Sequence, residues 1–336
     1  MSGLLDTQTH MAIEAAYGVY QAPTRSFEVT SDPAKAQRQH LEFVGFRAGL
    51  QGPRTDRRRK VETGAEGTLA TTPLETGFGM WLRLVSGLST ITQQGVTTAW
   101  LQRHVTTSAA PGLSATVQQG RSPVGEADAI QPYTYLGGKA HEVTWTCEPG
   151  DGDSGLLKAE VGLDYAEEIK PSDGGAPALA TPVYPANDHP FGWDDLLITI
   201  DGDELDFCTS MSLTQAFEVN REKYYMKRDT RKRKPTRNNI TRPTGELACD
   251  YDLVADLYGL VDGEDHELVM EWEAPTLAGV GHPFAFRIIT HVEFIGDSPE
   301  SSMDKETAQP LNFVVLHDLG GDPMVQYEYM SSDVAY

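Results

Sequence analysis

The sequence is poor in cysteine and in long apolar stretches. Cys147, Cys208 and Cys249 are its three cysteines, and no two of them form a C-x-x-C pair. A disulfide framework or a zinc site is therefore not expected, and the thiols are expected to stay reduced. The longest apolar runs are short, for example "NFVVL" at 312–316, whereas a membrane-spanning helix needs about 20 apolar residues. The first residues lack a basic stretch followed by an apolar one, so we expect no signal peptide.

Basic residues are also scarce, and this limits the possible partners. The chain has 27 Lys and Arg against 49 Asp and Glu, a net charge of −22. Such a chain repels free DNA at long range, which argues against a nucleic-acid-binding protein. Twelve of the 27 basic residues nevertheless fall in two short runs, "RTDRRRK" at 54–60 and "KRDTRKRKPTR" at 227–237. The composition thus indicates an acidic body with two basic spots.

Each basic run is followed by the same order of elements. A strand pattern begins at a glycine, a polar break follows, and a helical pattern then ends at a second glycine. A two-residue insertion or deletion brings the two units into line, and this order predicts an internal duplication. The aligned pairs are Gly67/Gly245, Leu69/Leu247, Ala70/Ala248, Phe78/Val254, Trp81/Leu257, Leu82/Tyr258, Val85/Val261 and Gly87/Gly263.

Both helical patterns are short and have one apolar face. In the first, Thr72 and Glu75 are expected to form a capping box with Pro73 at the first helical position, and Gly87 is expected to end the helix. In the second, Asp252 is the expected N-cap. Spacing of i, i+3, i+4 and i+7 assigns the apolar faces. The expected core positions are Phe78, Trp81, Leu82, Val85, Val254, Leu257 and Val261.

The rest of the chain is dominated by period-two segments between Gly, Asp and Pro turns. Examples are "HEVTWTCE" at 141–148 and "FAFRIITHVEF" at 284–294. They predict a mainly β protein of two related β-sandwich or β-barrel domains, each with one short packed α-helix. The expected domains are 1–170 and 193–336, joined by a linker at 171–192. Residues 105–132 are expected to form a long loop in the first domain.

The ordered set of segments resembles the tail tube proteins of long-tailed, siphovirus-like phages and of archaeal tailed viruses. "EAAYGVYQAPTRSFEV" (14–29) is similar to the opening segment of that family, and 63–87 is similar to its strand-to-helix unit. Residues 133–168 resemble its paired strands, and 196–224 with the following basic loop, strand and helix resemble its second half.

The resemblance implies a structural virion protein, without enzymatic activity, cofactor, metal or membrane. It implies stacked rings that form the conduit for viral DNA, assembled in the host cytoplasm. Two tube-like repeats per chain favour homotrimeric pseudo-hexameric rings, with a homohexamer as the alternative. Tape measure protein and DNA would occupy the lumen, and tail terminator and distal tail or baseplate proteins would bind the ends.

The two basic runs are expected at hairpin tips, where they would contact acidic surfaces of neighbouring copies. A solvated flexible loop is the alternative interpretation of each run. The proposed inter-subunit or inter-ring contacts are Arg54, Arg57, Arg58, Arg59, Lys60, Arg228, Arg231, Lys232, Arg233, Lys234 and Arg237.

Two other functions are weighed against a tail tube. One is a non-enzymatic β-sandwich module of a baseplate or a carbohydrate-binding protein. The other is a hydrolase, because "GDSG" at 152–155 and the order His104, Asp128, Ser154 resemble a serine protease. The residues around His104 lack the protease context, and triads are recognised by geometry rather than order. A Gly/Asp/Ser turn explains Ser154 better.

Overall fold

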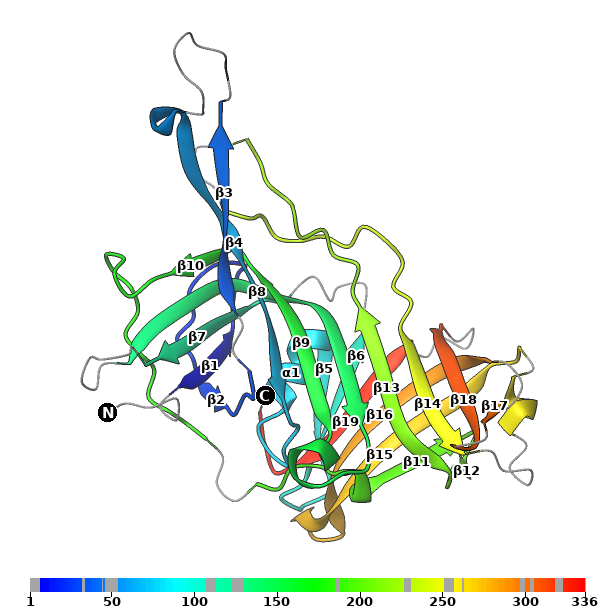
Figure 1. Ribbon diagram of the computed structural model, residues 1–336. Helices are drawn as coiled ribbons and strands as arrows, with labels where there is room; N and C mark the ends of the chain where they lie inside the picture. Colours follow the sequence, from blue (N-terminus) through cyan, green and yellow to red (C-terminus); the bar gives the residue numbers. More distant parts are fainter. Residues whose placement is uncertain are drawn as a thin grey trace.

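The protein is described by a computed structural model and is mainly β, with every strand pairing of the described residues antiparallel. The described residues are 7–31, 34–43, 45, 54–106, 113–122, 130–184, 188–226, 231–250, 257–261, 263–296, 300–302, 305–317 and 323–335. Figure 1 shows the arrangement of the elements. The strands are β1 (Gln8–Ile13), β2 (Arg25–Phe27), β3 (Lys35–Glu42), β4 (Arg58–Thr71), β5 (Gly87–Gln93), β6 (Trp100–Thr106), β7 (Ala115–Arg121), β8 (Gln131–Cys147), β9 (Lys158–Tyr165), β10 (Glu167–Ile169), β11 (Leu196–Ile200), β12 (Asp203–Glu204), β13 (Cys208–Ala216), β14 (Thr244–Asp250), β15 (His266–Gly279), β16 (His282–Ile295), β17 (Glu300–Ser302), β18 (Lys305–Leu316) and β19 (Val325–Ser331).

Strands from the two halves of the chain belong to one sheet. The 17-residue β8 pairs with β9 along one edge and with β13 along the other. From there the sheet continues through β14 and β18 to β16. Strand β16 also pairs with β15 and β19, and β19 pairs with β6 of the first half. The first part of β8 pairs with β7 and β10, and β1 and β2 follow beyond β7.

The sheet folds over a core to which both halves contribute. The ring of Trp145 on β8 lies 5.1 Å from that of Phe286 on β16 and 5.6 Å from that of Tyr327 on β19, measured between ring centroids. Phe78 adds an edge-on contact with Trp145. All four side chains are buried, and the buried apolar residues form one connected core. Aromatic packing across the sheet therefore holds the two halves together.

The alternating strand patterns are confirmed. Along β8, Val143, Trp145 and Cys147 point into the core, and along β9 the alternate residues Ala159, Val161 and Leu163 do the same. The expected Asp-Gly turn after β11 is present, with positive φ at Asp201 and Gly202. Period two in the sequence thus marks which face of each strand is buried.

The first helix, α1 (Gly79–Ser86), is present, but its predicted start is wrong. Phe78, not Thr72, is the N-cap residue, and it makes no side-chain cap. Residues before it instead pair with 188–192, through a Leu74–Pro190 bridge and a hydrogen bond from the Glu75 amide to the His189 carbonyl. Tertiary pairing therefore overrides the local capping signal. The predicted apolar face is confirmed, since Phe78, Trp81, Leu82 and Val85 are buried, and Gly87 ends the helix at φ 91°.

The predicted long loop at 105–132 is wrong, because β7 crosses it. Strand β7 pairs with both β1 and β8, and its residues from Ala115 to Gly120 are buried. Its buried polar side chains disguise it in the sequence. Gln118 donates to the Ala178 carbonyl at 3.0 Å and accepts from the Ala180 amide at 2.7 Å. The buried polar side chains of β7 find hydrogen-bond partners in an irregular segment of the same chain. The strand can therefore be buried without the apolar alternation that would reveal it in the sequence.

The second expected helix falls largely outside the described residues, including Asp252 and Val254. The described part, Leu257–Leu260, is a single turn of 3₁₀ helix, and Val261 packs partly buried against the core. Further 3₁₀ helices within the described ranges are Thr55–Arg57, Gly152–Gly155 and Trp193–Asp195. Over the described ranges, no helix has the length and apolar character required to cross a membrane.

Candidate functional site

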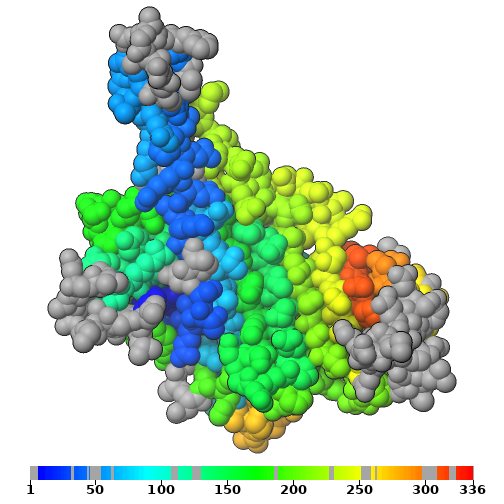
Figure 2. All heavy atoms as spheres, viewed as in Figure 1, coloured from blue at the N-terminus to red at the C-terminus, as the bar shows by residue number. Residues whose placement is uncertain are grey.

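Strands β3 and β4 form a two-stranded arm that projects from the body (Figure 1). They pair from Lys35↔Glu66 at the base to Glu42↔Arg58 near the tip. The 14-residue β4 runs continuously from the arm into the body, where it pairs with β9. Residues 38–43 of the arm are exposed, and they include the apolar side chains of Leu41 and Phe43. The described part of the arm is therefore a ribbon without a core of its own, and Figure 2 shows it as a narrow projection from the body.

The first basic run lies at the far end of this arm. Arg57, Arg58, Arg59 and Lys60 are exposed, and Arg54 is half-buried. Within the run Arg54 pairs with Asp56, and the Arg57 guanidinium lies 5.2 Å from the centre of the Phe43 ring. The Arg58 guanidinium is 3.9 Å from the Glu42 carboxylate. The end of the arm thus presents a dense positive surface beside an exposed aromatic ring.

The second basic run lies between β13 and β14, in a segment that extends toward the arm (Figure 1). Arg231 forms an ion pair with Glu167, and Arg233 stacks over Tyr225 at 5.6 Å. Lys234 is exposed and Arg237 is half-buried in a bridge with Val219. Arg228, with the rest of 227–230, falls outside the described residues.

Lys232 anchors the second basic segment to the body. Its ammonium lies 2.5 Å from Asp164 Oδ1, and both side chains are almost fully buried. Burial raises the pKa of Asp164, and the charge of Lys232 opposes that shift. The Lys232 stem also packs on Gly64 of β4, where a Cβ would meet Lys232 Cδ at 3.0 Å. The positive charge of Lys232 is consequently used inside the chain, whereas the exposed members of both runs face outward.

Lys139 on β8 is, like Lys232, a buried lysine, and it should make the free energy of unfolding depend on pH. Burial and the nearby charge of Lys234 lower the pKa of Lys139 to about 7, with Glu14 opposing. Above that pH the unfolded chain, whose lysines titrate near about 10.4, binds a proton that the folded chain has released. The free energy of unfolding should therefore rise by about 2 kcal/mol between pH 7 and pH 9 relative to Lys139→Met. Urea unfolding of both proteins at the two pH values measures this difference.

The exposed Lys234 provides the control for that measurement. Lys234→Met removes a neighbouring charge but leaves the buried amine, so it should retain most of the pH dependence. An identical pH dependence in wild type and Lys139→Met would contradict the assignment.

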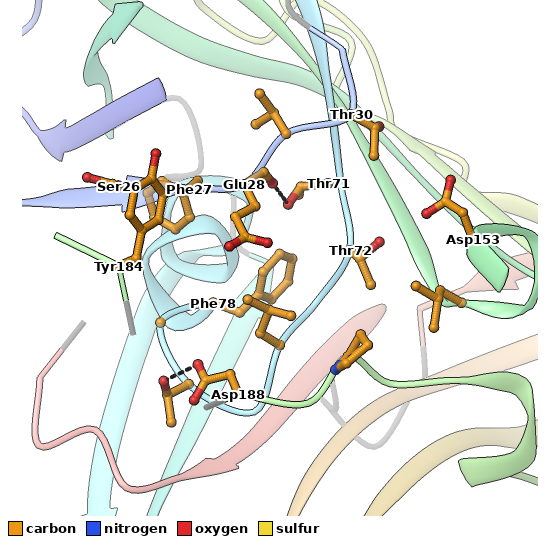
Figure 3. Close-up of a pocket in the computed structure, with 16 residues that line it drawn as sticks. Ser26, Phe27, Glu28, Thr30, Thr71, Thr72, Phe78, Asp153, Tyr184 and Asp188 are labelled. Atoms are coloured by element: carbon orange, nitrogen blue, oxygen red, sulfur yellow. Dashed lines mark hydrogen bonds between the residues drawn. The ribbon is translucent and has the colours of Figure 1, made fainter. Parts of the chain in front are cut away.

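An acidic recess lies in the body, where β4 ends at Thr71. It has a volume of about 510 Å³, and four segments of the chain line it. The lining residues are 26–30, Thr71, Thr72, Leu74, 76–78, Asp153, Leu156, Tyr184, Asp188 and Pro190. Figure 3 shows three carboxylates around it, those of Glu28, Asp153 and Asp188. Phe27 and Phe78 line its apolar part. Among the described residues that line it there is no Lys or Arg, so the recess is negatively charged.

Of the three recess carboxylates, that of Asp188 is partly buried and held by a hydrogen bond, whereas Glu28 and Asp153 are exposed. Thr76 donates to Asp188, and the Thr71 hydroxyl donates to the backbone carbonyl of Glu28 at 2.8 Å (Figure 3). Burial raises the pKa of Asp188, and the Thr76 hydrogen bond lowers it. Burial, followed by the charge of Glu28, raises the pKa of Tyr184 at the rim. This surface is suited to a partner that brings positive charge and some apolar area.

The residues that resemble a serine protease lie in unrelated settings. Ser154 donates to the Asp151 carbonyl at 2.8 Å within the 3₁₀ turn between β8 and β9. His104 is buried on β6, and its Nδ1 lies 2.7 Å from the Ser89 hydroxyl. Burial lowers the pKa of His104 to about 3. Asp128 lies outside the described residues. The turn at Ser154 agrees with the interpretation of "GDSG" as a Gly/Asp/Ser turn between strands.

The recess could not be found in the sequence, because four distant segments form it and none carries a motif. Its one hint was the polar, threonine-rich stretch "TTPLET" at 71–76. The basic runs, in contrast, are visible as composition. The first spans the β3–β4 connection and the start of β4, and the second lies in the β13–β14 connection.

Comparison with protein families gives the same answer as the segment order. The model of the family described as "Phage tail tube protein" matches residues 5–315, nearly the whole chain. This match confirms the resemblance found in the sequence. No curated protein sequence matches the chain. The family is structural and generally non-enzymatic, and its members are components of the viral tail. The chain belongs to the phage tail tube protein family.

Proposed function

We propose that this protein self-assembles head to tail into stacked rings that form the tail tube, the conduit for viral DNA. The observation that carries the proposal is that one chain presents two surfaces of opposite charge at different places. An arm without a core of its own carries a basic cluster near its tip, and an acidic recess lies in the body where β4 ends at Thr71. A molecule that carries two complementary surfaces at different places forms head-to-tail contacts with its own copies.

The arm supports this proposal because it lacks internal stabilisation. A two-stranded hairpin is marginally stable in water, and exposed Leu41 and Phe43 add apolar area that a partner would bury. From Arg58 to Thr71, β4 covers about 40 Å at about 3.3 Å per residue. The basic end of the arm is therefore far from the recess of the same copy, and a neighbouring copy's recess is its natural counterpart.

The exposed basic residues are the proposed contacts, and the recess carboxylates are their proposed counter-charges. Opposite charges at such a contact steer association and fix its register more than they add affinity. Lys232 acts indirectly, because its buried ion pair positions the second basic segment. The contact residues proposed to face the neighbouring copy are Arg54, Arg57, Arg58, Arg59, Lys60, Arg228, Arg231, Arg233, Lys234 and Arg237.

We also propose that the two halves, 1–170 and 193–336, derive from a duplication and occupy equivalent places in the ring. In support, each basic run precedes or begins the second strand of an antiparallel pair, β4 in the pair β3–β4 and β14 in the pair β13–β14. The aligned Leu69 and Leu247 are both buried on β4 and β14. Three chains would then complete a pseudo-hexameric ring, and a homohexamer is the alternative.

The further partners follow from a tube of the siphovirus-like kind. An acidic lumen releases DNA phosphates that a basic lumen would hold, which suits the net charge of −22. Tape measure protein and DNA would occupy the lumen, and the tail terminator and distal tail or baseplate proteins would cap the ends. Assembly would take place in the host cytoplasm.

Electron microscopy of the concentrated protein tests this function. Hollow rods or stacked rings are the expected result, and end-on views should show three-fold symmetry with a six-fold outline. True six-fold symmetry would favour the homohexamer. Discrete particles at every protein and salt concentration, even with tail initiator proteins added, would contradict self-assembly and favour a β-sandwich binding module.

A further inference from the structure

Cys208 and Cys249 lie directly opposite each other on neighbouring strands. They are the first aligned pair of β13 and β14, at the end of this strand pair away from the second basic segment. Cys249 is buried and Cys208 is half-buried, and both are free thiols. Their separation in the sequence gives no hint of this, because only the register of the two strands brings them together.

The hydrogen bond next to the cysteine pair shows whether the pair occupies a hydrogen-bonded or a non-hydrogen-bonded position of the two strands. The Asp250 amide donates to the Phe207 carbonyl at 3.0 Å, so the adjacent pair 207/250 is hydrogen-bonded. A register shift follows the pair, between Cys208 and Ser210, so the alternation is taken from the other side, at Phe207 and Asp250. Alternation from that side makes Cys208/Cys249 a non-hydrogen-bonded pair, a position in which Cα atoms are typically about 4.5 Å apart and side chains are close. That separation falls inside the range that a disulfide bond spans, about 4.4–6.8 Å.

The two thiols are neighbours and differ in acidity. Each has a backbone partner: Cys208 donates to the Ser210 carbonyl at 3.2 Å and Cys249 to the Leu247 carbonyl at 3.9 Å. The nearness of Cys249 lowers the pKa of Cys208, and the nearness of Cys208, with burial, raises the pKa of Cys249. Cys208 also lines a surface hollow of about 240 Å³, together with Trp193, Leu205 and Met211. The more acidic thiol is thus the one that a small reagent can reach.

We propose that Cys208 and Cys249 form a reversible cross-strand disulfide when the protein meets a small-molecule disulfide such as oxidised glutathione. The Cys208 thiolate attacks one sulfur of the reagent, which forms a mixed disulfide and releases one glutathione thiolate. Cys249 then loses its proton and attacks Cys208 Sγ, which releases the second glutathione. Two protein thiols are oxidised to one disulfide, and one glutathione disulfide is reduced to two thiols.

The bond would close a covalent loop around the second basic segment. That segment leaves the sheet after Ala216 and returns at Thr244, so both of its ends lie inside the loop that Cys208 and Cys249 would close. In the oxidised tail tube subunit, the disulfide would restrain the two strands from which this segment leaves and to which it returns. The segment also contacts the base of the arm, through Lys232 and Gly64.

Thiol counting tests the proposal on the full-length protein. The reduced protein is freed of reductant, incubated with oxidised glutathione, quenched in acid, denatured and alkylated with iodoacetamide. Two of the three thiols should become protected together, and peptide mass mapping should find Cys208 linked to Cys249. Dithiothreitol should restore all three thiols.

Single variants separate the steps. Cys249→Ser should stop at a stable glutathione adduct on Cys208, Cys208→Ser should form no linkage, and Cys147→Ser should retain the wild-type behaviour. Burial raises the pKa of Cys147 to about 11, and Cys147 lines the same hollow as Cys208, so it serves as the control for a thiol of higher pKa at this place. Three alkylatable thiols in the treated wild type, an unresolved adduct on Cys208, or a linkage to Cys147 would each overturn the proposal, whether or not the variants fold.

Discussion

Replacing Arg57, Arg58, Arg59 and Lys60 by glutamate should abolish the growth of rods. The four side chains are exposed at the end of the arm, so the substitutions leave the core untouched. They turn a positive surface into a negative one, which would then face the carboxylates of the next copy's recess. Like charges at a contact cost several kcal/mol and cut the association rate. Light scattering during assembly and electron microscopy of the product measure the effect.

Two controls show whether charge is the cause. Changing Arg57, Arg58 and Arg59 to lysine keeps the charge, and most of the assembly should survive. Changing Glu28, Asp153 and Asp188 to lysine in the glutamate variant should restore rods, because the two reversed surfaces match again. Normal rods from the glutamate variant, with unchanged symmetry, would refute the arm as an assembly contact. If raised salt restored rods in the glutamate variant, without any change in the recess, the loss of growth would reflect general charge repulsion rather than this contact.

Replacing Asp164 by asparagine should destabilise the folded protein by about 3–5 kcal/mol. The substitution preserves shape but leaves the Lys232 ammonium buried without its carboxylate, and a buried charge that has lost its partner is costly. Side chains of both residues are almost fully buried, so water cannot take the place of the lost partner. Urea unfolding gives the free energy, and hydrogen exchange of residues 217–243 reports release of the second basic segment.

The matched controls remove charge in other ways. The double variant Asp164→Leu with Lys232→Met removes both buried charges and should recover most of the loss, since buried ion pairs rarely stabilise more than apolar residues of similar size. Arg231→Met breaks the more exposed pair with Glu167 and should cost less than about 1 kcal/mol. Equal losses for Asp164→Asn and Arg231→Met would show that burial does not decide the strength of these pairs.

Much of the fold could be predicted because the relevant signals are local. Alternation marks the buried faces of β8 and β9, and the spacing of Phe78, Trp81, Leu82 and Val85 marks the core face of α1. Gly87 at positive φ ends that helix as expected. Each signal depends on residues within about two turns or one strand, where backbone geometry alone relates side chains to faces.

The errors arose where a distant segment altered the outcome. Thr72 and Glu75 have the residue types of a capping box, but pairing with 188–192 keeps this stretch extended. The 105–132 segment has the composition of a loop, but β1 and β8 flank it and convert its middle into β7. Gln118 illustrates the reason, since its buried amide is satisfied by backbone groups of Ala178 and Ala180 and by the Thr134 hydroxyl on β8.

The sequence by itself determined the mainly β class, the first helix, the two basic runs and the family. All of these depend on composition, order and short-range periodicity. The tertiary structure alone decided that β13 joins β8, that Lys232 is buried on Asp164 while the end of the arm stays exposed, that four segments form an acidic recess, and that Cys208 faces Cys249. The physical reason is that burial and contact depend on strand register, and register is fixed by long-range packing of the whole sheet.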